Sequence, residues 1–135
     1  MSNKPSKKKI LLLGGSCAQI PAIVKAKEKN LYTILCDYLP DNPGQEHADE
    51  FHQVSTTDKE AVLSVAKKLK VDYVMAYASD PAAPTAAYVA EKLGLPGSSY
   101  ASVRVLSEKD LFREMLKKNK FNSPRAISFT EADIQ

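Results

Sequence analysis

The chain is poor in the residues that build the commonest metal and nucleophilic sites. It has no tryptophan, two cysteines, two histidines and five glycines in 135 residues. Cys17 and Cys36 lack a second cysteine or histidine at metal-ligand spacing and are interpreted as reduced thiols of a cytoplasmic protein. His47 and His52 flank an expected strand and are interpreted as surface or half-buried side chains. We predict no metal site and no catalytic residue; a nucleophilic Cys17 at a helix N-terminus stays open.

Long apolar runs and a strong charge of one sign are also missing. No run is long enough to cross a bilayer, and no signal-peptide core follows the first lysines. The net charge of +3 comes from a basic leader at residues 1–9, which holds four of the 19 basic side chains; the rest of the chain has 15 against 16 acidic ones. We therefore expect no membrane partner, no nucleic-acid partner and a mobile leader.

What the chain does contain is a series of short apolar segments that alternate with amphipathic ones. The first, residues 10–13 (ILLL), suits a strand buried on both faces, as in a parallel sheet. The glycine pair 14–15 then permits a sharp turn. Ser16 is predicted to cap a helix that begins near Ala18, with Pro21 in its first turn. Such a turn presents backbone N–H groups to a ligand above the strand, although a purely structural turn explains the glycines as well.

Further strands and helices follow in alternation. Strands are expected at residues 32–37, 51–54 and 73–77, an extended piece at 98–99 and an edge strand at 125–129. Helices are expected after a capping box at 57–60, from Asp80 to Gly94 and from 107 to about 119, with one helical turn at 47–50. This pattern predicts an α/β fold: a three-layer, doubly wound, Rossmann-like parallel sheet of order 3-2-1-4, compatible with a short fifth strand.

The predicted order locates a candidate binding site. Strands 1 and 4 are neighbours where the order reverses, and ligands of open α/β sheets bind there, beyond the carboxyl ends of the strands. The candidate substrate-binding residues follow these strand ends and are Gly14, Gly15, Ser16, Asp37, Ser79 and Asp80. Asp37 is equally well explained as a turn residue, and Asp80 as a helix cap.

Several nucleotide-binding and catalytic motifs are absent. No register of the first turn supplies Gly-x-Gly-x-x-Gly, and neither a P-loop nor a nucleophile elbow is present. Asp37 does lie where a ribose-binding acid would lie, at the end of the second strand. An NAD- or nucleotide-sugar-binding Rossmann domain therefore stays as an alternative, and a stand-alone regulatory or binding module is a second one.

Five segments, taken in order, carry a resemblance to a known family. They are ILLLGGSCAQIPAIVKAKEKN, ILCDYLPDNPG, HADEFHQVSTTDKEAV, SDPAAPTAAYVAEKLGLPG and SEKDLFREMLKKNKFNSP. Together they resemble the N-terminal domain of ATP-grasp superfamily ligases, the pre-ATP-grasp or biotin-carboxylase-like domain, and most closely its carbamoyl-phosphate-synthase-like members. The resemblance covers residues 9 to about 128.

The resemblance implies a carboxylate–amine (or thiol) ligase that uses ATP and Mg²⁺ and forms an acyl phosphate. It implies that Gly14 and Gly15 line the acceptor-substrate side and that Lys109 contacts an ATP phosphate. The family's partners for this domain are a small acid or amine substrate and a C-terminal ATP-grasp domain. The sequence does not identify the substrate, and a homodimer is compatible with it.

The resemblance also divides the chain. Residues 1–9 are the leader, 10–106 the pre-ATP-grasp domain, and 107–135 a linker helix with the start of an ATP-grasp domain. Because the sequence stops at Gln135, we expect a fragment that is inactive by itself and binds no cofactor.

Overall fold

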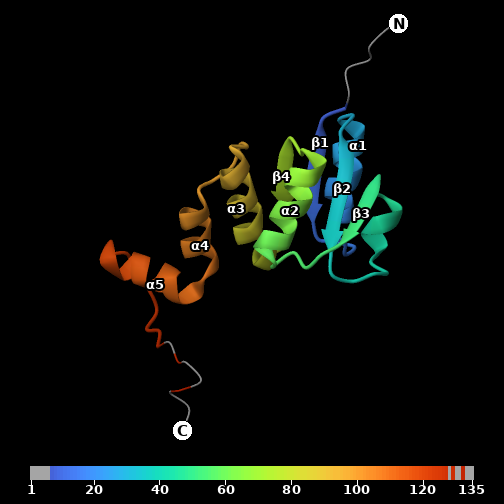
Figure 1. The fold of residues 1–135 in the computed structure, drawn as a ribbon. Helices are drawn as coiled ribbons and strands as arrows, with labels where there is room; N and C mark the ends of the chain where they lie inside the picture. The colour runs from blue at the N-terminus through green and yellow to red at the C-terminus, as the bar shows by residue number, and fades with distance from the viewer. Residues whose placement is uncertain (1–6, 128, 130–131, 133–135) are drawn as a thin grey trace, which may run out of the picture.

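The computed structural model describes residues 7–127, 129 and 132 and shows a four-stranded sheet with helices on both sides (Figure 1). Its strands are β1 (Lys9–Leu13), β2 (Tyr32–Asp37), β3 (Glu50–Gln53) and β4 (Tyr73–Ala76). Its helices are α1 (Ile20–Glu28), α2 (Lys59–Leu69), α3 (Ala83–Leu93), α4 (Tyr100–Ser107) and α5 (Lys109–Lys118), with 3-10 turns η1 (Pro43–Glu46) and η2 (Asp80–Ala82). In this part of the chain no helix is long and apolar enough to span a membrane.

The sheet is wholly parallel and has the order β3-β2-β1-β4, which confirms the predicted fold class. In the central pairings Leu11 lies opposite Ile34 of β2 and Val74 of β4. Strand β1 is central, so its residues must fill both faces of the sheet, and four consecutive apolar residues do this. The carboxyl ends of β1 and β4 consequently lie next to each other at the point where the strand order reverses.

Alternate residues of β1 enter two separate cores. Leu11 and Leu13 pack with α2 and α3 on one face, where Val62 and Val89 are fully buried. On the other face Ile10 and Leu12 pack with α1, whose Ile23 is fully buried; the layers can be followed in Figure 1. The glycine turn after β1 is therefore anchored from both sides, and this rigid base positions the loops above it.

Two helix starts differ from the sequence prediction. Helix α1 begins at Ile20 with Gln19 at its N-cap position, so the prediction that Ser16 caps a helix from Ala18 is wrong. Asp58, not Thr57, caps α2: its carboxylate accepts the N–H of Ala61 at 3.0 Å. In both cases several polar residues adjoin the helix start, and the approach of the loop selects one of them.

The turns beside β3 and β4 also differ. The helical turn expected at 47–50 lies earlier, at η1, where Pro43 supplies the first position. Asp80 opens the short turn η2 rather than α3 itself, and α3 follows from Ala83. Gly94 ends α3 with φ +64°, as predicted.

The end of the chain holds one helix that the sequence prediction missed. Residues 98–99 precede α4, which Ser99 caps by accepting the N–H of Ser102. Helix α5 begins near the predicted residue and contacts α4, away from the sheet (Figure 1). Residues 125–127 and 129 belong to no strand, so the predicted edge strand is wrong for them; residue 128, like 1–6 of the leader, lies outside the described part.

Candidate functional site

A cleft of about 520 Å³, which we call the strand-end cleft, lies above the carboxyl ends of the four strands. Its walls come from the loops that follow β1, β2, β3 and β4, because parallel strands deliver all of these loops to one edge of the sheet. The lining residues are Gly14, Ser16, Gln19, Asp37, Tyr38, Ser55, Thr56, Thr57, Ser79 and Pro81. The structure therefore brings together four of the six predicted substrate-binding residues. Gly15 is buried and Asp80 is exposed, and neither lines the cleft; Pro81, next to Asp80, does.

The turn after β1 uses its own N–H groups to hold itself in place. Gly14 adopts φ +104°, a conformation that favours glycine, and donates its N–H to the Cys36 carbonyl at 2.9 Å. Gly15 donates its N–H to Asp37 Oδ2 at 2.7 Å. The expectation that both glycines present free N–H groups to a ligand is therefore wrong.

Asp37 closes this turn from the end of β2. Its Oδ1 accepts the Leu39 N–H at 2.9 Å, and only 8% of the residue is exposed. Each carboxylate oxygen thus has one backbone donor and keeps a further acceptor position, and the residue lines the cleft. This is the turn role that the sequence left open, and it is compatible with a ligand contact as well.

A second loop packs against Gly15 so closely that no side chain fits there. A Cβ atom on Gly15 would lie 2.0 Å from Asn42 Oδ1, and a Cβ on Gly44 would lie 2.8 Å from the Gly15 Cα. The Gly44 N–H bonds the Gly15 carbonyl at 2.7 Å. Asn42 is buried, and its Oδ1 is a buried side-chain atom without a hydrogen-bond partner in the described residues. The pair Gly15–Gly44 thus permits a close contact between backbones.

Gln19 is a site residue that the sequence reasoning missed. Its Oε1 accepts the Ser16 N–H at 2.9 Å and the Ser16 hydroxyl, and its Nε2 donates to the Ala78 carbonyl at 2.9 Å. The side chain is 7% exposed, so these bonds are largely shielded from water. Gln19 therefore ties the loop after β1 to the loop after β4 and sets the spacing of the two walls. No sequence signal marked this role, because Gln19 falls inside the helix that was predicted to begin near Ala18.

The loop after β4 carries the opposite wall. Ala78 has φ +49°, which is strained for alanine, and precedes Ser79 at the N-cap of η2. The Ser79 hydroxyl makes no capping bond within the described residues. Tyr38 and the 55–57 segment complete the site from the β2 and β3 loops. Their hydroxyls were identifiable only as polar residues that follow strands.

The remaining candidates do not line this cleft. Lys109 is the first residue of α5 and is exposed. Cys17 is exposed in the glycine loop, whereas Cys36 is buried, and this burial, with the Asp37 charge, raises the pKa of its thiol to about 12. His52 pairs with Glu50 at 2.8 Å. Across residues 7–127, 129 and 132 there is no cluster of three potential metal ligands.

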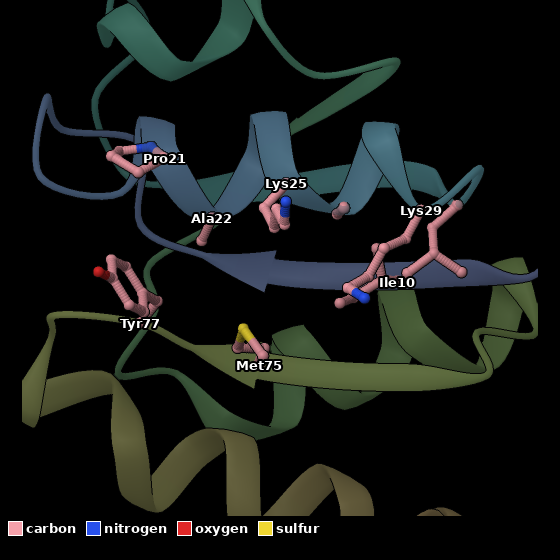
Figure 2. Close-up of a pocket in the computed structure, with 9 residues that line it drawn as sticks. Ile10, Pro21, Ala22, Lys25, Lys29, Met75 and Tyr77 are labelled. Atoms are coloured by element: carbon pink, nitrogen blue, oxygen red, sulfur yellow. The ribbon is translucent and has the colours of Figure 1, made fainter.

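A second cleft, of about 500 Å³, lies between α1 and β4 (Figure 2). Its lining is mainly apolar and includes Met75 and Tyr77, which are 44% and 46% exposed. Two lysines, Lys25 and Lys29, also contribute, and Lys25 is paired with Glu28 at 2.7 Å. Most of this lining is aliphatic, whereas most residues that line the cleft at the strand ends carry polar side chains, so the strand-end cleft is the better candidate site.

Comparison with solved structures defines the fold more closely. Phosphoribosylglycinamide synthetase from Anaerococcus prevotii matches 95% of this chain with a TM-score of 0.80 and 23% identity, over 33% of its own length. L-amino acid ligase from Bacillus licheniformis matches 90% with a TM-score of 0.69 and 24% identity, over 32% of its length. N5-carboxyaminoimidazole synthetase from Staphylococcus aureus, complexed with ADP, matches 85% with a TM-score of 0.66 and 21% identity, over 31% of its length. No family model matches the sequence.

These neighbours are ATP-grasp enzymes, and the chain matches the N-terminal part of each. The class is thus a Rossmann-like α/β domain. More particularly, its fold is that of the pre-ATP-grasp domain, which confirms the resemblance at the level of the fold. The chain spans about a third of the length of the enzymes it matches.

Proposed function

We propose that this chain is the N-terminal, substrate-side domain of a cytoplasmic ATP-grasp ligase. The ligase joins a carboxylate to an amine (or thiol) through an acyl phosphate and is carbamoyl-phosphate-synthase-like. One observation carries the proposal: the strand-end cleft is built on a fold that ATP-dependent ligases share over 85–95% of this chain. Residues 10–106 form the domain in this proposal, and 107–135 lead into the ATP-grasp domain.

The site residues take their roles from their positions. Gly14, Gly15 and Asp37 build the floor and one wall, since Gly15 bonds the Asp37 carboxylate and Gly14 bonds the carbonyl of the neighbouring Cys36. Ser16 and Ser79 offer side chains to the acceptor substrate from opposite sides. Asp80 lies at the rim, where its exposed carboxylate orients a substrate amine.

In this proposal the nucleotide binds away from the strand-end cleft, between Lys109 and the ATP-grasp domain. Lys109 fits a phosphate contact, because it is an exposed ammonium at the start of a helix. The described residues do not fit a Mg²⁺ site, since they contain no cluster of three potential ligands. In this proposal the metal ligands lie in the ATP-grasp domain, and no step of the reaction is assigned to residues of this chain.

The test uses the longer protein that carries this chain. We expect ADP release that depends on both the acid and the amine, and a hydroxamate when hydroxylamine replaces the amine and traps the acyl phosphate. The 135-residue chain alone should release no ADP above a protein-free blank. Hydride transfer to NAD, or ADP release that ignores every acid and amine offered, would contradict the proposal and favour the Rossmann alternative.

A further inference from the structure

At the glycine turn of the strand-end cleft, the backbone N–H groups that could bind an anion already have hydrogen-bond partners within the protein. In the glycine turn, the N–H groups of Gly14, Gly15 and Ser16 bond Cys36, Asp37 and Gln19 at 2.7–2.9 Å. These bonds are buried or partly buried, so offering one of the N–H groups to a phosphate would leave a polar partner without its bond. A turn of this shape binds phosphate only when its N–H groups are free.

The charge of the lining also disfavours an anionic ligand. Asp37 is the one ionisable carboxylate in the lining, and no lysine, arginine or histidine of the described residues joins it there. A carboxylate that lines the cleft repels a phosphate or a second carboxylate. It accepts hydrogen bonds from hydroxyl groups without that cost.

Hydroxyl groups supply most of the remaining polar lining. Ser16, Tyr38, Thr56 and Ser79 come from four loops. The Ser16 hydroxyl bonds Gln19 Oε1, and Ser55 and Thr57 bond each other at 3.0 Å. A hydroxyl both donates and accepts, so it pairs with ligand hydroxyls in either sense. Gln19 fixes the distance between the walls and has both ends of its amide occupied.

We propose that this cleft binds an uncharged, hydroxyl-bearing part of the acceptor substrate, a sugar or polyol moiety. A phosphate or carboxylate of the same molecule lies outside the cleft. This inference rests on the proposed function, because it names the class of substrate group that the domain holds. Asp37 accepts from the ligand hydroxyls, and Ser79 and Thr56 bond them from the facing loops.

The direct test is an amide chemical-shift titration of the 135-residue chain. The probes are D-ribose, D-ribose 5-phosphate and inorganic phosphate at constant ionic strength. We expect both sugars to shift the amides of Ser16, Tyr38 and Ser79 in a saturable way, with dissociation constants within about threefold of each other. Phosphate alone should shift none of them saturably. Saturable phosphate binding at these amides, tenfold tighter binding of the sugar phosphate than of ribose, or no ribose binding would each overturn the inference.

Two variants locate the binding and one controls for it. Thr56→Val and Ser79→Ala each remove one hydroxyl from the lining and should weaken ribose binding about 3- to 10-fold, the usual effect of one hydrogen bond. Ser64→Ala removes an exposed hydroxyl from α2, outside the cleft, and should change nothing. Equal affinities in all three variants would contradict the assignment to this cleft.

The two proposals fail in different ways. If the longer protein makes no hydroxamate but the chain binds ribose at these amides, the ligase function is wrong and the cleft assignment stands. If the ligase reaction is found and ribose does not bind, only the substrate class is wrong.

Discussion

Gly15 is confined on two sides, by the side chain of Asn42 and by the backbone at Gly44. A methyl group on Gly15 would clash with Asn42 unless Asn42 and the η1 loop moved. Overpacking of this kind usually costs about 1–3 kcal/mol. The resemblance implies a contact with substrate for this glycine, whereas the structure shows a packing reason that operates without any ligand.

We expect Gly15→Ala to destabilise the chain by about 1–3 kcal/mol in urea unfolding. Gly94→Ala is the matched control: apart from its chain neighbours, no atom of the described residues lies within 4 Å of its added Cβ, and its cost comes from φ +64°, about 1 kcal/mol. A Gly15→Ala midpoint equal to that of the unsubstituted chain would show that the loop relaxes freely.

The two cysteines should differ in reactivity. In the native chain at pH 8, a disulfide reagent such as Ellman's reagent should label the exposed Cys17 and spare the buried Cys36. Both should react in urea.

Because the Cys36 pKa is raised from about 9 to about 12 by burial and by Asp37, the unfolded thiol ionises first as pH rises. Stability should therefore fall above pH 9, most steeply between pH 9 and 12. A Cys36→Ala chain that loses stability equally over this range would contradict this cause.

At the scale of elements, the start of helix α2 shows which of two adjacent polar residues is its cap, a choice that the sequence could not make. Thr57 and Asp58 are adjacent, and both residue types cap helices well. The Asp58 carboxylate bonds the Ala61 N–H, whereas the Thr57 hydroxyl pairs with Ser55. A side chain can cap only from the residue whose backbone leaves the helix at the right angle.

Asp58→Ala should lower the free energy of unfolding by about 0.5–2 kcal/mol, the usual range for a lost cap. Thr57→Ala should change it by less than about 0.5 kcal/mol, because Thr57 is exposed and outside the helix. Urea unfolding of both variants measures the difference. The reverse order would restore Thr57 as the cap.

At the scale of the whole molecule, α4 and α5 extend from the sheet domain toward the end of the chain (Figure 1). Lys109 is the first residue of α5 and lies outside the strand-end cleft. In the proposed ligase, the acceptor and the nucleotide therefore meet different parts of this chain. Mutations in the two parts should affect different kinetic constants.

In the proposed ligase, Lys109→Ala should raise the ATP KM about 10- to 100-fold, because a charge-assisted hydrogen bond to phosphate contributes roughly 1.5–3 kcal/mol. The urea midpoint of the 135-residue chain should not change, since Lys109 is exposed. Lys118→Ala, at the other end of α5, is the control and should leave the ATP KM unaltered. An unchanged ATP KM in the Lys109 variant would remove the lysine from the nucleotide site.

The sequence predicted the sheet well because strand order follows from local patterns. The ILLL run, the alternation with amphipathic helices and the handedness of crossovers together left few arrangements for four strands. Strand β2 has the predicted bounds, and the strand-end cleft contains Gly14, Ser16, Asp37 and Ser79 as predicted. Helix α4 was missed because it is short, with eight residues, and because Ser98 and Ser99 precede it in a turn-rich stretch.

What the sequence alone determined was therefore which loops meet. Only the tertiary structure decided what those loops offer to a ligand. The Gly15 N–H finds its acceptor 22 residues away in Asp37, and Gln19 finds the Ala78 carbonyl 59 residues away. No local pattern encodes such pairs, because a hydrogen bond depends on distance and angle in the folded chain. The sequence therefore predicted a glycine turn with N–H groups available to a ligand, whereas in the structure these N–H groups are bonded within the protein.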